Sequence, residues 1–445
     1  MSTATRTRSG RTPARASGNS RRQRRNGAPS TAAPQAVPAT TTLRPLSRTS
    51  RVGPVELRQL VLVEAGLAMA AVGVALGGLW LIPTCSVASL LVLLAVIRRR
   101  GHALPDWFAT VVALRSRKRA SAPSPADVDV SLAPVVEGVP GIRPFPYVDR
   151  ERRTVGMLGD GTFLTAVVRV EASGAALRPA SGARALPLSL LGDALEVDDI
   201  TLESAQLVQQ VRSAPAPHLP QQSVARLSYA PLQERTGAPA LRMTWVAVKL
   251  DPELCREAIE ARGGGVSGAQ RCLVRMADHV ASRITGAGFQ AVVLDQEELN
   301  STMATAACAS PRLATRPGGP DAAPQRRTAE TARVWRCDDR WHTTYAVGRW
   351  PVLGRGATPL PKLVSLLTAA PAYATTFSLT VRRGVRQGTI DVGGHVRVTG
   401  GSDTELVGVR RALEQAARSA KVGLVRLDRE QLPGVLATMP LGGAR

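Results

Sequence analysis

The chain has 445 residues, enough for one large domain or two to three ordinary ones, and 44% of them are hydrophobic, which suffices for a core. Its formal net charge of +23 is uneven, because eleven arginines and no acidic residue lie within residues 1–55. This placement argues against a basic nucleic-acid groove across a folded domain. Five cysteines without a C-x-x-C pair argue against a disulfide framework and a structural zinc site, and favour buried reduced thiols.

Residues 1–54 form an arginine-rich tail of Ser, Thr, Pro and Ala with almost no large apolar residue, so we expect this tail to be disordered. Arginine-rich tails can bind nucleic acid, but no interleaved aromatic residue offers a base-stacking platform here. A lipid-facing tail that sets membrane orientation is therefore the preferred interpretation, and no nucleic-acid partner is expected.

An apolar segment follows at residues 59–98, in which Leu60–Ile97 carries one acidic residue, Glu64, and no basic one. A single helix of this length would be about 57 Å long, whereas the hydrocarbon core of a bilayer is about 30 Å thick. The sequence therefore predicts a transmembrane hairpin of two helices that reverses at Gly77–Gly78. A cleaved signal peptide is the competing interpretation, but the apolar region is roughly double a usual h-region.

Basic residues flank this hairpin on both sides, whereas the turn between its helices carries no charge. Eleven arginines lie in residues 1–55 ahead of it, and Arg98–Arg100 and a second cluster at 115–119 follow it. Cytoplasmic loops carry the excess of lysine and arginine in membrane proteins. We therefore expect a multi-pass protein of the cell membrane with both termini in the cytoplasm.

The first predicted span contains a stripe of small residues, Gly66, Ala70, Gly73 and Gly77, whose spacing places them on one helical face. Gly73 and Gly77 form a G-x-x-x-G pair, and small residues allow two helix backbones to approach closely. The stripe is a candidate packing face, either against the other helix of the hairpin or against another subunit.

The sequence of residues 103–119 predicts a short amphipathic helix that lies in the membrane interface. Trp107 and Phe108 are its aromatic side chains, and a basic cluster closes it. We expect the aromatic rings to anchor the helix and the cationic groups to contact anionic lipid headgroups. The basic residues are Arg115, Arg117, Lys118 and Arg119.

A linker rich in Ser, Pro and Ala at 120–140 leads to a cytoplasmic domain at 141–445, with a flexible insertion at 309–330. Alternating strand patterns and amphipathic helices predict a mixed α+β domain. A hairpin at Thr154–Glu171 and a strand at Arg242–Leu250 belong to its first half. Asp295 and Glu298 form a capping box for a helix.

The glycines at Gly263, Gly265 and Gly268 have the spacing of a dinucleotide-binding G-x-G-x-x-G motif. A nucleotide-binding loop must follow a strand, whereas here a helix opened by Asp251–Pro252 precedes it. No lysine or Ser/Thr follows Gly268 as a phosphate loop requires. Gly263, Gly264, Gly265 and Gly268 are therefore predicted to reverse one helix into the next, with Ser267 able to cap the second helix.

The second half of the domain partly repeats the first. Thr244–Lys249 is echoed by Thr344–Arg349, and Leu294–Leu299 is echoed by Leu427–Leu432 as L-D-x-E-x-L. These two short matches raise the hypothesis of an internal α/β duplication with two lobes.

No constellation of catalytic residues emerges from the sequence. Asp127 and Asp129 form a D-x-D in the linker, the spacing with which some glycosyltransferases hold a metal-bound nucleotide-sugar. Asp198–Asp199 and Asp338–Asp339 are adjacent pairs whose side chains diverge on a strand. No G-x-S-x-G elbow is present. We therefore predict no catalytic, cofactor or metal site and no small-molecule substrate.

The ordered combination of basic tail, helical hairpin, T-W-V-A-V-K-L-D-P, R-G-G-G-V-S-G-A and a terminal R-L-D-R-E-Q-L-P-G-V-L-A-T-M-P-L-G resembles EccE. EccE is a membrane component of the actinobacterial type VII (ESX) secretion system. The resemblance covers residues of about 55 to 445 and implies a non-enzymatic subunit beside the EccB, EccC and EccD components and the mycosin protease. The alternative is a membrane-anchored transferase that uses an activated nucleotide-sugar, which would need converging carboxylates or a phosphate loop.

Overall fold

The computed structural model describes residues 51–52, 55–78, 81–96, 98–99, 102–125, 127–172, 186–212, 222–224, 227–228, 231, 241–311, 326–351, 359–384 and 389–443. The predicted disordered tail lies almost wholly outside these residues. The described helices, with the short 3-10 helix η2 at Pro252–Cys255, are α1 Leu57–Leu76, α2 Leu81–Val96, α3 Leu104–Ala120, α4 Ala133–Gly138, α5 Ser189–Asp193, α7 Arg256–Ala261, α8 Gly265–Gly286, α9 Gln296–Ala306, α11 Leu360–Thr368, α12 Asp403–Ser419 and α13 Gln431–Ala437.

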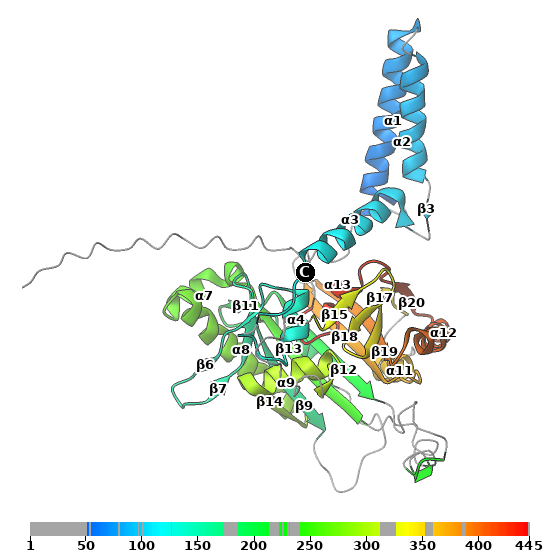
Figure 1. The fold of residues 1–445 in the computed structure, drawn as a ribbon. Helices are drawn as coiled ribbons and strands as arrows, with labels where there is room; N and C mark the ends of the chain where they lie inside the picture. Colours follow the sequence, from blue (N-terminus) through cyan, green and yellow to red (C-terminus); the bar gives the residue numbers. More distant parts are fainter. Residues whose placement is uncertain are drawn as a thin grey trace, which may run out of the picture. The chain divides into compact units, whose positions relative to one another are not determined.

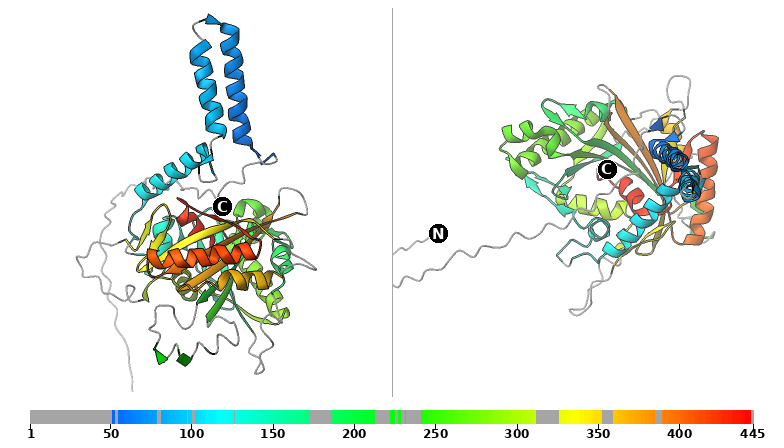
Figure 2. Two further views of the ribbon diagram at one scale, coloured as in Figure 1. Left: turned by 90° about the vertical axis from the view of Figure 1, so that its right-hand side faces the viewer. Right: turned by 90° about the horizontal axis from the view of Figure 1, so that it is seen from above.

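Helices α1 and α2 lie side by side as an antiparallel hairpin (Figures 1 and 2). The chain reverses at Gly77 and Gly78, whose φ angles of 59° and 56° lie in the left-handed region that glycine adopts without a steric penalty. None of the helices in the described ranges meets both the length and the hydropathy needed to cross a membrane. The hairpin itself is therefore observed, and its insertion in a bilayer stays a prediction.

The rest of the described chain is a mixed α+β fold around one large antiparallel sheet, which confirms the predicted fold class of this part (Figure 1). Its twelve strands run in the order β15-β16-β17-β19-β18-β12-β13-β9-β8-β5, with β14 also paired to β9 and β20 also paired to β17. The strands are β5 Arg143–Pro144, β8 Met157–Gly159, β9 Leu164–Ala172, β12 Ser204–Arg212, β13 Leu241–Leu250, β14 Phe289–Val293, β15 Thr328–Glu330, β16 Trp335–Cys337, β17 Arg340–Arg349, β18 Ala374–Arg383, β19 Ile390–Gly400 and β20 Gly423–Arg426.

Four two-stranded ribbons accompany the main sheet. They pair β1 Arg51–Val52 with β2 Val55–Glu56, β3 Arg98–Arg99 with β4 His102–Ala103, β6 Tyr147–Val148 with β7 Thr154–Val155, and β10 Glu196–Val197 with β11 Ile200–Thr201.

The strand order of the large sheet repeats outward from its central pair, β12 and β18. One side continues through β13 to β9, whose outer edge pairs with β8 and β14. The other side continues through β19 to β17, whose outer edge pairs with β16 and β20. Along the chain, β9-α5-β12-β13-α8-β14-α9 is matched by β17-α11-β18-β19-α12-β20-α13.

This order decides between the two sequence echoes. Thr244 lies on β13 and Thr344 on β17, but the strand that corresponds to β17 in the first half is β9. The similarity between Thr244–Lys249 and Thr344–Arg349 therefore does not reflect a structural repeat. Leu294 and Leu427 do hold equivalent places, because the N–H of Leu294 donates to Val167 O at 3.0 Å and that of Leu427 donates to Thr344 O at 3.1 Å. Descent of both halves from one duplicated unit stays a prediction.

One face of the sheet is covered by α5, α7 and α8 over its first half and by α11 and α12 over its second (Figure 2). Helix α8 buries Leu273, Met276 and Val280 at helical spacing, and α12 buries Leu406 and Leu413 in the same way. Two apolar clusters result, one for each half of the sheet.

The opposite face is covered by α4, α9 and α13 and is unusually polar near its centre. Residues 437–443 cross it and are held through their main chain. Gln206 Nε2 and Ser378 Oγ both donate to Ala437 O at 2.8 Å, and Ser204 Oγ donates to Gly442 O at 2.6 Å. Because Gln206 and Ser378 lie on β12 and β18, this segment ties the two halves together.

Two predicted boundaries differ from the observed ones. The linker expected at 120–140 contains α4, in which Val135 and Val136 are buried in the core below the polar face. The insertion expected at 309–330 ends earlier, because β15 at Thr328–Glu330 pairs with β16. In both places apolar or hydrogen-bonding side chains find partners far away in the sequence, which a local composition cannot show. Residues 312–325 lie outside the described ranges.

Candidate functional site

The glycine-rich turn joins α7 to α8, and no strand leads into it. Gly263, Gly264 and Gly265 have positive φ angles of 100°, 69° and 57°. The N–H of Gly264 donates to Ile259 O at 2.9 Å and that of Gly263 to Glu260 O at 3.0 Å. This is the paired hydrogen-bond pattern of a Schellman motif, which ends a helix.

The amide groups of Gly263 and Gly264 therefore bond to carbonyl groups of α7, whereas in a nucleotide-binding loop they would bond to phosphate. Gly268 allows α8 to approach α7 closely, because a Cβ at this position would lie 2.4 Å from Ile259 O. The predicted capping role of Ser267 is wrong, since α8 begins at Gly265 with Gly264 as its N-cap residue and no side-chain cap.

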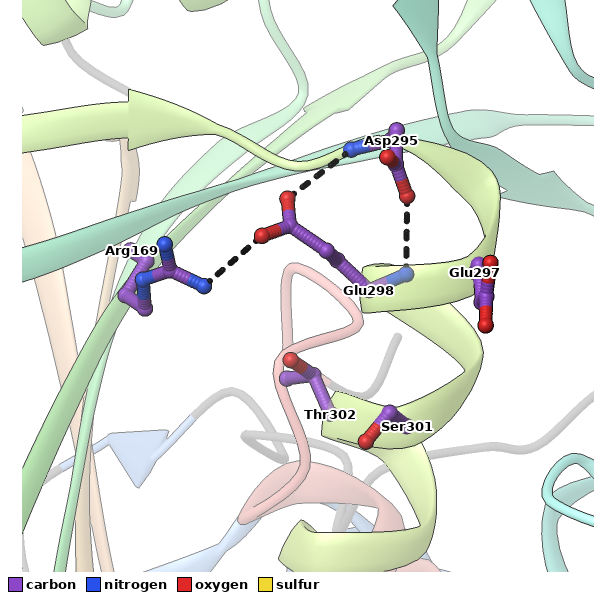
Figure 3. A pocket seen from close by; sticks show the side chains of 6 residues that line it. All are labelled: Arg169, Asp295, Glu297, Glu298, Ser301 and Thr302. Atoms are coloured by element: carbon purple, nitrogen blue, oxygen red, sulfur yellow. Dashed lines mark hydrogen bonds and ion pairs between the residues drawn. The ribbon is translucent and has the colours of Figure 1, made fainter.

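A shallow hollow of about 310 Å³ lies at the N-terminus of α9 and is lined by Arg169 and acidic or hydroxyl side chains (Figure 3). Asp295 Oδ1 accepts the N–H of Glu298 at 2.8 Å, and Glu298 accepts the N–H of Asp295 at 3.4 Å, so the predicted capping box is confirmed. Glu298 also accepts from Arg169 Nη1 at 3.0 Å. The hydrogen-bonding groups of Asp295, Glu298 and Arg169 are thus bonded to one another, and the hollow is explained by the capping of α9.

The acidic pairs singled out in the sequence are engaged with distant side chains. Asp129 accepts from Asn300 Nδ2 at 2.8 Å, and Asp338 pairs with Arg327 at 2.7 Å. Asp199 pairs with Arg262 at 2.7 Å, and this guanidinium holds the pKa of Asp199 below its usual value. Within the described ranges, no group of three or more His, Cys, Asp or Glu side chains is placed to hold a metal ion.

The small-residue stripe of α1 faces α2. Gly66 and Gly73 are buried, and Ala70 and Gly77 are half-buried. A Cβ at Gly73 would lie 2.0 Å from Thr84 Oγ1 on α2, so these helices meet at a distance that only glycine permits.

The inner face of α3 docks on the sheet domain through two reciprocal arginine contacts. Arg117 of α3 donates from Nε and Nη2 to the carboxylate of Glu330 on β15, both at 3.0 Å. From the sheet domain, Arg429 places its guanidinium 5.3 Å from the Trp107 ring and donates from Nε to Thr110 Oγ1 at 3.0 Å. Glu330 also accepts the N–H of Leu432 at 3.0 Å, at the first turn of α13.

The predicted lipid anchors of α3 therefore lie on two different faces. Arg117 and Trp107 are engaged with the sheet domain, and the Arg117 side chain is only 12% exposed. Phe108 is 53% exposed, and Arg115, Lys118 and Arg119 are also exposed. Sequence reasoning missed Glu330 and Arg429. Glu330 lay in the expected insertion at 309–330. Arg429 lies in a turn, where its φ is 69°, and no local pattern marks its side chain as a contact residue.

The described residues form a helical hairpin, a docked helix and a large sheet, and the candidate motifs singled out in the sequence take part in helix capping, ion pairs and packing. Residues 238–347, which run from β13 to β17, match the model of the EccE family, described as a type VII ESX secretion system translocon. The resemblance of this chain to EccE is thereby confirmed, and this family is named for a secretion component and not for an enzymatic activity.

Curated relatives carry the same name. The ESX-1 secretion system protein EccE1 of Mycobacterium tuberculosis is 29% identical over 222 residues, which cover 46% of this chain and 42% of the relative. The EccE1 protein of Mycolicibacterium smegmatis is 25% identical over 244 residues, which cover 48% of this chain and 47% of the relative. The chain thus matches less than half of the length of these relatives.

Proposed function

We propose that this protein is a non-catalytic structural subunit of a type VII (ESX) secretion membrane complex. The observation that carries this proposal is the EccE match over residues 238–347, which contain the core strand β13, most of β17 and the packed helices α8 and α9. The expected partners are the other membrane components, EccB, EccC and EccD, and the mycosin protease. The rival transferase has no support in the glycine turn, because its amides cap α7.

The hairpin of α1 and α2 is proposed to insert in the cell membrane, with both of its ends in the cytoplasm. Its basic flanks and its uncharged turn support this orientation. A reporter enzyme that is active only outside the cytoplasm, fused after Arg445, is expected to stay inactive. The same reporter inserted after Gly78 is expected to be active, and activity in the first fusion would contradict the orientation.

The outer face of α3 is proposed to lie on anionic lipid headgroups. Phe108, Val112, Arg115 and Arg119 follow one another at spacings of four and three residues, and all four are exposed. Apolar side chains next to cations on a single helix face are typical of interfacial helices. Arg117 is not part of this face, since it pairs with Glu330.

Vesicle binding tests this face. The detergent-purified protein with residues 57–96 deleted should float with vesicles that contain phosphatidylserine, and Arg115→Glu with Arg119→Glu should reduce the bound fraction at least tenfold, at about 1 kcal/mol for each basic residue near the surface. Arg411→Glu, a change of equal charge on the exposed side of α12, is the control. Equal losses for both variants would contradict the proposal, and circular dichroism establishes that the deleted protein is folded.

A further inference from the structure

A completely buried arginine, Arg397 of β19, has no carboxylate partner among the described residues. Its Nη2 donates to Ala306 O and to Thr376 Oγ1. Its Nε and Nη1 have no hydrogen-bond partner, although the side chain is 0% exposed. Burial lowers the pKa of Arg397, and the acidic groups that oppose this shift are the thiols of Cys308 and Cys337.

Other buried cations of the described chain, unlike Arg397, have a carboxylate partner. Arg117 pairs with Glu330, Arg327 pairs with Asp338, and Lys249 pairs with Glu203 at 3.1 Å. A buried charge without a counter-ion costs several kcal/mol, and buried N–H groups without an acceptor are rare in folded proteins. An acceptor of negative charge is therefore expected beside Arg397.

Two neighbours of Arg397 also have unmet polar atoms. Thr344 lies directly opposite on β17, is fully buried, and has an Oγ1 without a partner. His342, two residues earlier on the same face, has Nδ1 at 3.0 Å from Thr399 Oγ1 and an unpartnered Nε2. When Thr399 donates to Nδ1, Nε2 carries the proton, and the site offers donors from three side chains.

We propose that Arg397, Thr344 and His342 bind a small monovalent anion of the halide class inside the core. A halide ion accepts several hydrogen bonds at once and neutralises the guanidinium, whereas a water molecule accepts them without supplying the missing charge. Gln210, beyond Thr376 on β12, has an unpaired acceptor oxygen, which water and not an anion would satisfy.

The place of this site gives it a role in stability. Thr344, Arg397, Thr376 and Gln210 form one row across β17, β19, β18 and β12, and therefore cross the central strand pair of the sheet. All of these side chains are buried, so the ion is taken up on folding and released on unfolding. Halide then stabilises the sheet by mass action.

The test is unfolding of the full chain in detergent at constant ionic strength, with gluconate replaced stepwise by chloride or bromide. The unfolding equilibrium constant is expected to fall tenfold for each tenfold rise in halide above the Kd. Arg397→Met should abolish this dependence. Lys249→Met, which removes a buried cation from the same sheet face, should keep it.

If Arg397→Met does not fold, Thr344→Val keeps the arginine and removes one donor, and it should weaken the halide dependence. An anomalous bromide peak beside Arg397 in crystals grown with bromide would support the site directly. Halide-independent unfolding of the unaltered protein, or a crystal with water and no anomalous peak at this position, would overturn the proposal.

Discussion

At the scale of single residues, the pair of Arg117 and Glu330 has the clearest energetic consequence. Their side chains are 12% and 4% exposed, and two parallel hydrogen bonds join them. Removing one partner of a buried pair leaves the other charge uncompensated and costs about 3–5 kcal/mol. We expect Arg117→Met to lower the free energy of unfolding by an amount near the lower end of this range.

Denaturant unfolding measures this loss, and Arg115→Met on the exposed face of α3 is the matched control, expected to change stability by less than about 0.5 kcal/mol. The double variant Arg117→Met with Glu330→Gln should recover part of the loss, because no charge then stays unpaired. A loss below about 1 kcal/mol for Arg117→Met would show that α3 is not docked in this way.

His342 predicts a specific dependence of stability on pH. Burial and the neighbouring Arg397 and Arg340 lower the pKa of His342 well below its ordinary value of 6.5. The unfolded chain therefore binds a proton below pH 6.5 that the folded chain does not bind. Stability is fully present above pH 6.5 and should fall by about 1.4 kcal/mol per pH unit below it, down to the lowered pKa.

Unfolding between pH 7 and pH 5, compared with the His342→Gln variant, isolates this contribution. The variant should be less stable at pH 7. Its free energy of unfolding should fall less steeply with decreasing pH, because the contribution of the His342 proton is gone. Equal slopes for the two proteins would show that His342 does not titrate in this range.

Gly264 tests the structural interpretation of the glycine turn. Its φ of 69° is unfavourable for a side chain, although a Cβ at this position would meet no neighbouring atom. Because its ψ of 174° places it in a region that essentially only glycine adopts, Gly264→Ala should destabilise the domain by roughly 1–3 kcal/mol through backbone strain alone. ATP, NAD and UDP-sugars should leave the Tm unchanged, and a dose-dependent rise in Tm that Gly265→Val removes would restore the nucleotide hypothesis.

At the scale of elements, the hairpin depends on the contact between Gly73 and Thr84. Gly73→Leu would force a side chain into the space occupied by Thr84 and should separate α1 from α2. Ala75→Leu, on the exposed side of the same helix, is the control and should have little effect. Thermal unfolding and the size of the complex on a native gel measure the change, and equal results for both variants would rule the stripe out.

The sequence predicted the elements whose signals are local. The hairpin turn at Gly77–Gly78, the capping box at Asp295 and the strand at Arg242–Leu250 follow from glycine, capping and alternation patterns, and the structure places each within about one residue of the expected position. Such signals depend on neighbouring residues only.

Contacts between distant residues could not be predicted in this way. Strand β12 at Ser204–Arg212 is not among the elements predicted from the sequence, because the partners of its polar side chains lie far away in the chain. Gln206, for example, bonds to the main chain of residues 437 and 442. Arg117 looked like a lipid anchor because its partner Glu330 lies 213 positions away. Composition shows that a charge is present, but not which charge it meets.

At the scale of the whole molecule, a docked helix joins the hairpin region to a sheet domain whose two halves share one order of elements. Arg117 of α3 contacts the sheet domain, and Arg429 of the sheet domain contacts α3. Glu330, the partner of Arg117, also accepts a hydrogen bond from the first turn of α13. Contacts of this kind suit the proposed role of a subunit that holds its sheet domain in place within a larger assembly. They give no advantage to a freely tethered enzyme.

Composition of the native complex is the most direct measurement of this function. Membranes from a bacterium that makes this protein are extracted with a mild detergent, the tagged chain is purified, and co-purifying proteins are quantified by mass spectrometry. We predict that other type VII membrane components co-purify in constant ratio, and that deletion of residues 57–96 removes them. A chain that purifies alone, or whose partners are unchanged by that deletion, would contradict a structural role in the secretion complex.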